Sequence, residues 1–139
     1  MKKKTTAQKK TALKKKCDEL WSKAVRLRDG RCLLCGKTDG LAAHHYIQSR
    51  ARSLLHRHNV KNGITLCFAC HIYKVHTDAT TNMLEQVKRA AIGNNIATEA
   101  EIEAISNDRS ICQLNLEDLE IRKAHLEDYI EELERGKTL

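Results

Sequence analysis

The chain has 139 residues, of which 4% are aromatic, and a formal net charge of +7. A chain of this length supports one modest domain with appendages and excludes two large domains. The charge is uneven: residues 1–31 carry twelve Lys and Arg against three acids, residues 32–80 six against two, and residues 81–139 seven against thirteen. Since Lys and Arg gain affinity by releasing counterions from nucleic acid, the basic front half is expected to face DNA.

Hydropathy and cysteine content indicate the compartment. No apolar run reaches the roughly 18 residues that a bilayer crossing needs. Lys2 to Lys4 are not followed by the apolar segment of a signal peptide. We therefore expect a cytoplasmic protein with no membrane partner. In that reducing compartment, the two Cys-x-x-Cys pairs among the six cysteines are expected to bind metal and not to form disulfides.

The first predicted element is a basic arm over residues 1–16, MKKKTTAQKKTALKKK. Its eight lysines and few apolar residues cannot bury enough surface to order the segment alone, so we expect a flexible arm that either contacts DNA or aids solubility. A helix follows over residues 17–29, because apolar residues recur there at spacings near three and four, and Gly30 supplies a natural stop. These apolar residues are Leu20, Trp21, Ala24, Val25 and Leu27.

The middle of the chain predicts a strand, a loop, a second strand and a helix. The strands are expected over residues 41–47 and 63–67, and the helix over residues 68–75, where no breaker occurs. Between the strands lies the polar loop 48–62, and long structured loops of this kind are often functional. The expected fold class is therefore mainly α with a small β-hairpin.

Beyond Asp78 the composition changes to helix formers. A helix is expected over residues 82–92, with breaks at 93–95 and 106–108 and a last helix over 116–135. An apolar seam at heptad spacing runs along that last helix. Its favoured partner is the helix expected over residues 82–92 of the same chain, and the main rival is a second copy or another protein. The seam consists of Cys112, Leu116, Leu119, Leu126, Ile130 and Leu133.

Two cysteine pairs form the strongest chemical signal. Cys32 and Cys35 are followed 31 residues later by Cys67 and Cys70, each pair with Cys-x-x-Cys spacing. Four thiolates match the tetrahedral coordination of a structural Zn²⁺, whose binding energy becomes folding energy in a small domain. A redox function would need only one pair. With all four positions taken by sulfur the site is closed, so this zinc is expected to be structural and not catalytic.

Histidines form the second signal. His44 and His45 are neighbours in the first predicted strand, His71 follows Cys70 directly, and His76 lies five residues further along. The four cysteines would pin the helix that carries His71 against the hairpin. Neighbouring residues of a regular strand point to opposite faces, so the pair is expected either at a twisted strand end or with His44 facing the helix and His45 the solvent.

These motifs together resemble the HNH endonucleases with their ββα-metal fold. The matching elements are the CxxCG knuckle after RDGRC, the pair His44 and His45, Asn62 followed by GITLC, and the CxxCH that ends at His71. The resemblance covers roughly residues 20–78. The flanking sequence is similar to that of small HNH proteins of bacteriophages, with a weaker similarity to Rap-type phage recombination nucleases.

The resemblance implies a role for each of these residues. His44 would bind a catalytic divalent metal together with His71, and His45 would be the general base. Asn62 would fix the loop and orient the base through hydrogen bonds, and His76 is a further candidate ligand. Many family members carry Asp where this chain has His44. An imidazole ligand shifts the preference toward Mn²⁺ or Ni²⁺, while Mg²⁺ stays open.

The chemistry agrees with these roles on physical grounds. Phosphodiester cleavage needs a deprotonated water and positive charge near the phosphate and the departing oxygen. A histidine with an ordinary pKa of about 6.5 is neutral enough at pH 7 to accept the water proton, and a divalent ion could supply the charge. Arg50, Arg52 and Arg57 of the loop are expected to contact DNA phosphates, whereas His56 and His58 are expected to be surface residues.

The expected organisation is a flexible basic arm over residues 1–16, an HNH nuclease domain over 17–80 and a helical C-terminal region over 81–139. The expected function is hydrolysis of DNA phosphodiester bonds, in phage DNA processing, packaging or recombination in the host cytoplasm. Two alternatives stay open. A non-catalytic zinc-knuckle DNA-binding accessory protein would need the cysteines and the basic front, but not His45 or His71. An interaction module would recruit a partner through its C-terminal helices.

Overall fold

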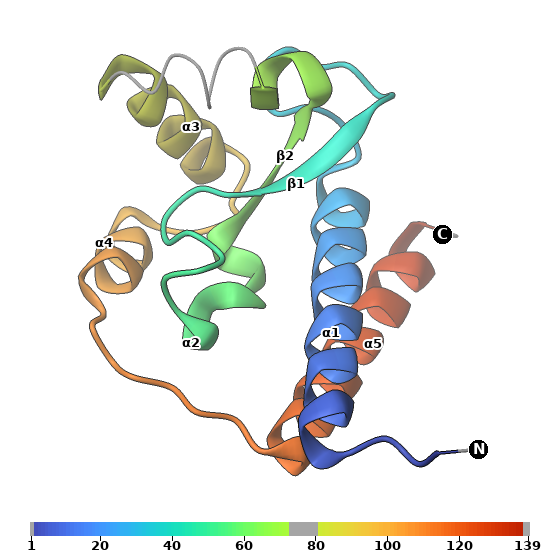
Figure 1. The fold of residues 1–139 in the computed structure, drawn as a ribbon. Coiled ribbons are helices and arrows are strands. Elements are labelled where there is room, and N and C mark those ends of the chain that lie inside the picture. Colours follow the sequence, from blue (N-terminus) through green and yellow to red (C-terminus); the bar gives the residue numbers. More distant parts are fainter. Residues whose placement is uncertain (1, 73–80, 138–139) are drawn as a thin grey trace.

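The computed structural model describes residues 2–72 and 81–137. This part of the chain is mainly helical, with one sheet of two antiparallel strands, as the sequence predicts (Figure 1). None of its helices combines the length and the apolar character that a membrane crossing requires. The elements in chain order are α1 (Thr6–Asp29), β1 (Leu41–His45), α2 (Leu54–Arg57), the short 3-10 helix η1 (Val60–Asn62), β2 (Gly63–Cys67), α3 (Thr81–Gly93), α4 (Glu99–Asn107) and α5 (Leu116–Lys137).

Helix α1 is longer than the sequence predicts and includes most of the lysine-rich arm. It begins at Thr6 because Thr5 and Gln8 form a capping box, in which each side chain accepts a hydrogen bond from the other residue's backbone amide. It ends where Gly30 adopts a left-handed conformation with a φ of 70°. The expectation of a flexible arm over residues 1–16 is therefore wrong from Thr6 onward.

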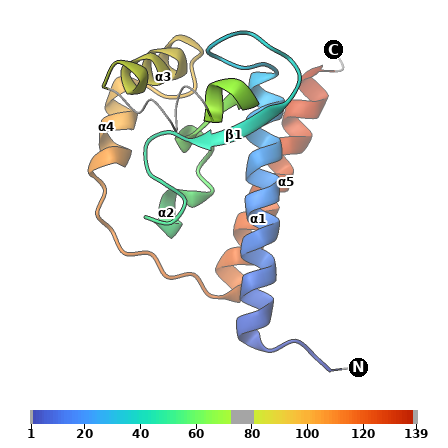
Figure 2. The ribbon, with the colours of Figure 1, turned by 45° about the horizontal axis from the view of Figure 1, so that its top comes forward.

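Helix α5 lies along α1 and packs against it (Figures 1 and 2). Leu119, Leu126 and Ile130 of the predicted seam are buried, and the thiol of Cys17 lies 3.8 Å from the carbonyl oxygen of Leu119. The seam thus packs on α1 and not on α3, the partner that the sequence favours. The irregular segment 108–115 permits this packing, because it runs from α4 across to the N-terminal half of α1 (Figure 2).

Apolar burial holds these two helices together more than their opposite charges do. Lys23 of α1 pairs with Glu134 of α5 at 3.6 Å, but both side chains are about half exposed. Such surface pairs contribute about 0–1 kcal/mol, whereas burying one Leu or Ile side chain contributes about 1.5–3 kcal/mol. These apolar contacts are made with Cys17, Trp21 and Val25, in the part of α1 that follows the lysine-rich arm.

The hairpin of β1 and β2 lies between α1 and α3. On one face, the hydroxyl of Thr65 donates a hydrogen bond to the carbonyl oxygen of Val25 in α1, at 3.1 Å. On the other face, Ile64 and Leu66 are fully buried in a cluster that includes residues of α3. All five residues of β2 are buried, which explains why this strand reads as the apolar run GITLC.

The end of α1 covers the outer edge of β2. The carboxylate of Asp29 accepts a hydrogen bond from the amide of Thr65 at 2.9 Å. The guanidinium of Arg28 donates to the carbonyl oxygens of Val60 and Gly63, at 2.6 and 2.7 Å. These bonds occupy backbone groups that an edge strand otherwise leaves unpaired.

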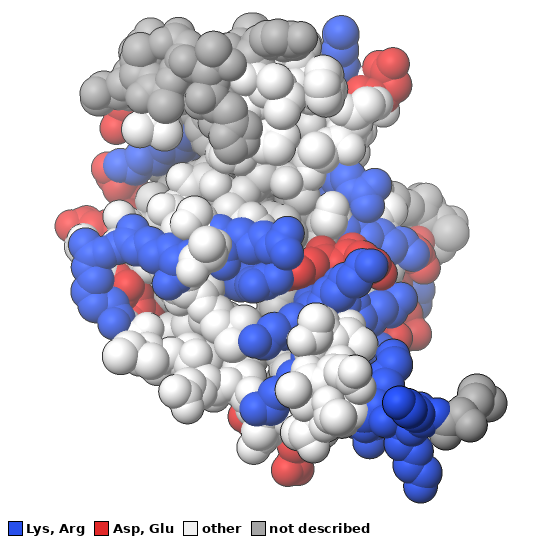
Figure 3. All heavy atoms as spheres, in the orientation of Figure 1, with Lys and Arg blue, Asp and Glu red and all other residues white. Residues whose placement is uncertain are grey.

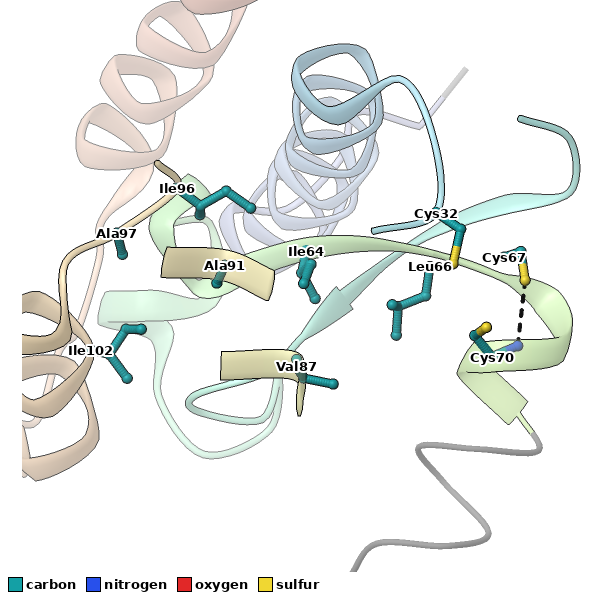
Figure 4. Close-up of a cluster of buried hydrophobic side chains, with 10 residues drawn as sticks. All are labelled: Cys32, Ile64, Leu66, Cys67, Cys70, Val87, Ala91, Ile96, Ala97 and Ile102. Carbon is teal, nitrogen blue, oxygen red and sulfur yellow. Dashed lines mark hydrogen bonds between the residues drawn. The ribbon is translucent and has the colours of Figure 1, made fainter. Parts of the chain in front are cut away.

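The main core lies between the hairpin, α3 and the start of α4, and it reaches the cysteines at one end (Figure 4). Leu66 stands between the cysteines and the residues contributed by α3 and α4. Three of the four paired cysteines, Cys32, Cys67 and Cys70, thus belong to the apolar core. Its buried members are Cys32, Ile64, Leu66, Cys67, Cys70, Val87, Ala91, Ile96, Ala97 and Ile102.

Candidate functional site

The four cysteines of the two predicted pairs meet at one end of the hairpin. Cys32 and Cys35 lie in the turn after α1, Cys67 ends β2, and Cys70 lies in the helical residues that follow. Their Sγ atoms all lie within 4.8 Å of one another. Zn–S bonds of about 2.3 Å in a tetrahedron place sulfurs about 3.8 Å apart, so the four thiols could hold a metal ion such as zinc. The other two cysteines, Cys17 and Cys112, are not part of this group.

The electrostatics of the cluster suit a cation. Burial opposes ionisation of Cys32, but backbone amides of Cys67 and Cys35 point at its sulfur and lower its pKa to about 6. The amide of Cys70 likewise donates to the sulfur of Cys67 at 3.5 Å. Burial and the neighbouring sulfurs raise the pKa of Cys70. Ionisation of all four thiols would therefore require a positive ion between them, a charge that a zinc ion could supply.

His44 and His71 lie together, as the sequence predicts. Their ring centroids are 5.0 Å apart and the rings meet edge to face, at an interplanar angle of 64°. The register explains this proximity, because His44 is paired with Ile64 and shares its face of the hairpin, away from α1. His76, the further candidate ligand, lies outside the described residues.

His45 points to the opposite face of β1, toward α1. Its ring stacks on the indole of Trp21, with centroids 3.9 Å apart and an interplanar angle of 8°. Both histidines lie within the strand, so the alternation of strand side chains separates them. One face of the His45 ring is covered by the indole of Trp21, while the residue stays partly exposed.

The hydrogen bond of His45 determines which nitrogen carries the proton. Nε2 lies 2.8 Å from the backbone carbonyl oxygen of Arg57. A carbonyl oxygen can only accept, so Nε2 donates, and Nδ1 of the neutral ring keeps a free lone pair. Burial lowers the pKa of His45, although this carbonyl and the nearby Asp18 favour the protonated form. The ring is therefore neutral at pH 7 and able to accept a proton at Nδ1.

Glycine at position 63 makes room for this arrangement. Gly63 is paired with His45 across the hairpin. A Cβ atom on Gly63 would lie 2.6 Å from side-chain carbons of both Trp21 and Val25. The close approach of the Trp21 indole to the hairpin thus depends on the absence of a side chain at this residue.

Asn62 joins the two ends of the connection between the strands, which comprises residues 46–62. It is fully buried. Its Oδ1 accepts hydrogen bonds from the amides of Ile47 and Gln48, at 3.0 and 2.9 Å. Its Nδ2 donates to the carbonyl oxygens of Gln48 and His56, at 2.8 and 3.1 Å. One side chain thus fixes the residues just after the histidine pair to the segment that carries Arg57.

A carboxylate from α1 holds the residue whose carbonyl contacts His45. Asp18 accepts two hydrogen bonds from the guanidinium of Arg57, at 2.8 and 2.6 Å, and one from Nε2 of His58 at 2.7 Å. Although burial opposes the ionisation of Asp18, these hydrogen bonds hold its pKa well below the usual range. Asp18 therefore stays ionised at neutral pH and ties this segment to α1.

Helix α5 completes the network. The guanidinium of Arg122 donates to Nδ1 of His58 at 3.0 Å and to the carbonyl oxygen of Leu54 at 2.7 Å. Since Arg122 can only donate, Nδ1 of His58 accepts and its Nε2 carries the proton toward Asp18. Burial lowers the pKa of His58. The four side chains of Asp18, Arg57, His58 and Arg122 are called the Asp18 clamp below.

Two histidines of the connection are not the surface residues that the sequence suggests. His58 is buried inside the clamp. Nε2 of His56 lies 2.9 Å from the carboxylate of Asp108, and its side chain is only 12% exposed. The expectation fails because the polar connection folds back between α1, α5 and the residues after α4, which gives each ring a carboxylate partner.

The three arginines expected to contact phosphates have different surroundings. Arg57 is committed to Asp18 by two hydrogen bonds. Arg50 is 64% exposed and lies 3.6 Å from the same carboxylate, while Arg52 is exposed. The charges of Arg50 and Arg52 are thus available at the surface, whereas that of Arg57 is largely compensated.

Several residues around His45 were not identified from the sequence. In the sequence, Trp21 is only an apolar position of a predicted helix and Asp18 a polar position of the same helix. Gly63 is only the start of a predicted strand. Arg122 lies far away in the acidic C-terminal region. The one local signal is that Asp18 is an acid inside a lysine-rich segment, which suggests a specific cationic partner without naming it.

No family model, curated protein or solved structure matches this chain.

Proposed function

We propose that the protein is a metal-dependent HNH endonuclease that hydrolyses DNA phosphodiester bonds. In this proposal β1, β2 and the helical residues 68–72 form the ββα-metal core, with a structural zinc bound by the four cysteines. The observation that carries the proposal is the arrangement around two neighbouring residues of β1. His44 meets His71 on one face of the hairpin, and His45 is held in one tautomer on the other face by the carbonyl of Arg57. In this proposal the scissile phosphate binds across the end of β1, within reach of both faces.

The proposed reaction assigns proton transfer to His45. Nδ1 takes a proton from a water molecule, the water oxygen attacks the phosphorus, and the bond from phosphorus to the 3′ oxygen breaks. The departing 3′ oxygen takes up a proton from solvent, and the ring then returns its own proton to solvent. The hydrogen bond from Nε2 to the carbonyl of Arg57 stabilises the positive ring that results. A divalent ion at His44 and His71 would supply positive charge for the phosphate and the departing oxygen. The products carry a 5′ phosphate and a 3′ hydroxyl.

Asn62 and the Asp18 clamp are positioning residues in this proposal. Neither needs to touch the substrate. Asn62 sets the path of the chain after His45, and Asp18 holds Arg57, whose carbonyl fixes the ring. Preorganisation of this kind lowers the barrier because the base needs no reorientation at the moment of reaction.

The second candidate is a non-catalytic zinc-knuckle DNA-binding accessory protein. The observation that favours it is the flat stack of His45 on Trp21, because such a half-buried ring also serves packing alone. Lys and Arg side chains, which such a protein needs, form a band across one face and gather at the start of α1 (Figure 3). Cleavage measurements separate the two candidates.

The deciding experiment compares cleavage of supercoiled plasmid by the zinc-loaded full chain and by His45→Ala, with Mg²⁺, Mn²⁺ or Ni²⁺ added. The wild type is expected to nick or linearise the plasmid at least about 100-fold faster, the usual contribution of a general base. His125→Ala is the matched control, because His125 is exposed on α5. Wild-type rates equal to those of His45→Ala with all three metals would leave the accessory protein as the function.

Metal dependence and substrate choice sharpen the same proposal. His44→Ala and His71→Ala are expected to weaken activation by the added divalent ion while the zinc content stays unchanged. A panel of linear, nicked, branched and single-stranded DNA, together with RNA, then defines the substrate. Equal activation of wild type and both variants by the added metal would remove His44 and His71 as its ligands.

A further inference from the structure

A hollow of about 420 Å³ lies between α1 and the connection that follows β1. Its wall is formed by charged side chains from both elements. Among the residues that the structure describes, no aromatic side chain lines it. The charged lining consists of Lys14, Lys15, Asp18, Glu19, Arg50 and Arg57.

The charges of this hollow do not cancel. Asp18 is already compensated, because it accepts hydrogen bonds from Arg57 and His58. Lys14 and Lys15 form no ion pair with any residue that the structure describes. Glu19 thus faces two unpaired lysines as well as the largely exposed Arg50. An anion entering the hollow meets a surplus of positive charge.

Three lysines that follow β1 in the chain have acidic partners. Lys61 pairs with Glu101, Lys88 with Glu99 at 3.4 Å, and Lys123 with Glu127 at 3.7 Å. Lys14 and Lys15 instead belong to the lysine-rich start of α1, where the neighbouring lysines likewise form no ion pair with a described residue. In Figure 3, blue side chains crowd the start of α1 and continue as a band across the face.

The hollow is adjacent to His45. Lys14, Asp18 and Trp21 follow one another at spacings of four and three, so they share one face of α1. Trp21 stacks on His45, and seven residues separate Lys14 from Trp21, a rise of about 10 Å along the helix. Arg57 joins both places, because its guanidinium lines the hollow and its carbonyl contacts His45.

We propose that this hollow binds the phosphates of a nucleic-acid strand and guides that strand along α1 toward His45. The direction of the strand rests on the proposed function, but binding does not. A rise of about 10 Å corresponds to about three nucleotides of one strand, at about 3.4 Å each. Without an aromatic platform for base stacking, the hollow recognises the backbone and binds independently of sequence.

The test measures how affinity depends on salt in the full chain carrying His45→Ala, which prevents cleavage during the measurement. A fluorescent 20-base-pair duplex is titrated at 50 to 200 mM NaCl, and log K is plotted against log[NaCl]. Each lost phosphate contact reduces the slope by about 0.9 for duplex DNA. Replacing Lys14 and Lys15 by Ala is therefore expected to flatten the slope by about 1.8.

The matched control replaces Lys88 and Lys123 by Ala, which removes the same charge from lysines that already have acidic partners. It is expected to change the slope by less than about 0.5. Alanine favours helices, and thermal melts verify that both double variants fold. Equal slope changes in the two pairs, or an unchanged slope after loss of Lys14 and Lys15, would overturn the hollow as the binding site.

Two further measurements separate this proposal from the nuclease proposal. If the wild type fails to cleave DNA but replacing Lys14 and Lys15 still flattens the salt slope, the binding proposal is supported and the nuclease proposal is contradicted. If cleavage requires His45 but the salt slope is unchanged by replacing Lys14 and Lys15, the nuclease proposal is supported and the binding proposal is contradicted. Binding of inorganic polyphosphate is measured on the same variants. If replacing Lys14 and Lys15 weakens the binding of polyphosphate but not the binding of DNA, a nucleic-acid strand is excluded as the occupant of the hollow.

Discussion

The two ends of the hairpin are held by different kinds of interaction. At the end where Leu41 pairs with Cys67, four sulfurs from two separate segments converge within 4.8 Å of one another. At the end where His45 pairs with Gly63, the structure instead uses hydrogen bonds from Asn62 and the Asp18 clamp. One end depends on a shared centre, and the other on many separate contacts.

This difference predicts different sensitivities. A four-sulfur centre acts as a unit, so losing one ligand or the ion releases all its segments together. A hydrogen-bonded network loses one contact at a time, and each buried group left unpaired costs about 1–3 kcal/mol. The cysteine end should therefore respond to chelation, and the histidine end to point substitutions and pH.

The largest expected effect is loss of the folded core on removing one sulfur. Cys67→Ser should abolish tight zinc binding and with it a free energy of order 10 kcal/mol that stabilises the fold. Thermal melting and zinc content measured on the same sample check this expectation. Cys112→Ser is the matched control, because Cys112 lies outside the cluster. A melting curve of Cys67→Ser that coincides with the wild type would remove the structural zinc.

A smaller loss is expected at the other end of the hairpin. Asn62→Ala leaves the amides of Ile47 and Gln48 and the carbonyl of Gln48 without the partners that Asn62 supplies, and we expect the free energy of unfolding to fall by about 3 kcal/mol. Asn59→Ala is the matched control, because it removes the cap of η1 and should cost about 1 kcal/mol. Urea titration at fixed zinc compares the two, and equal losses would contradict the role of Asn62 as the joint of the connection.

The smallest expected effect is a pH dependence from the Asp18 clamp. Burial lowers the pKa of His58 below that of the unfolded chain, about 6.5. The stability that the neutral ring contributes is therefore present above pH 6.5 and is lost as the pH falls below it. Melting temperatures of wild type and His58→Gln between pH 7.5 and 5.5, at saturating zinc, should converge toward the acid end.

The control for this pH effect is His125→Gln. His125 is exposed on α5, and its replacement should leave the pH profile of the wild type unchanged. A constant difference between wild type and His58→Gln across the whole range would show that His58 acts by packing and not by titration.

Much of the fold and part of the site could be predicted from local patterns. The spacing of Cys32, Cys35, Cys67 and Cys70 predicted the sulfur cluster, and the order of strand, loop, strand and helix brought His71 near His44. The last helix was also predicted, but its partner was wrong. An apolar seam shows that a helix needs a neighbour without identifying which one.

The sequence by itself determined the two strands, the last helix, the cysteine cluster and the proximity of His44 and His71, because each depends on residues close together or on a repeated short motif. Only the tertiary structure decided where His45 points and what holds it. Its contacts come from Trp21 and Asp18 of α1, through Arg57, and from Arg122 of α5. No local pattern records such contacts, since they arise only when apolar burial brings α1, α5 and the connection into contact.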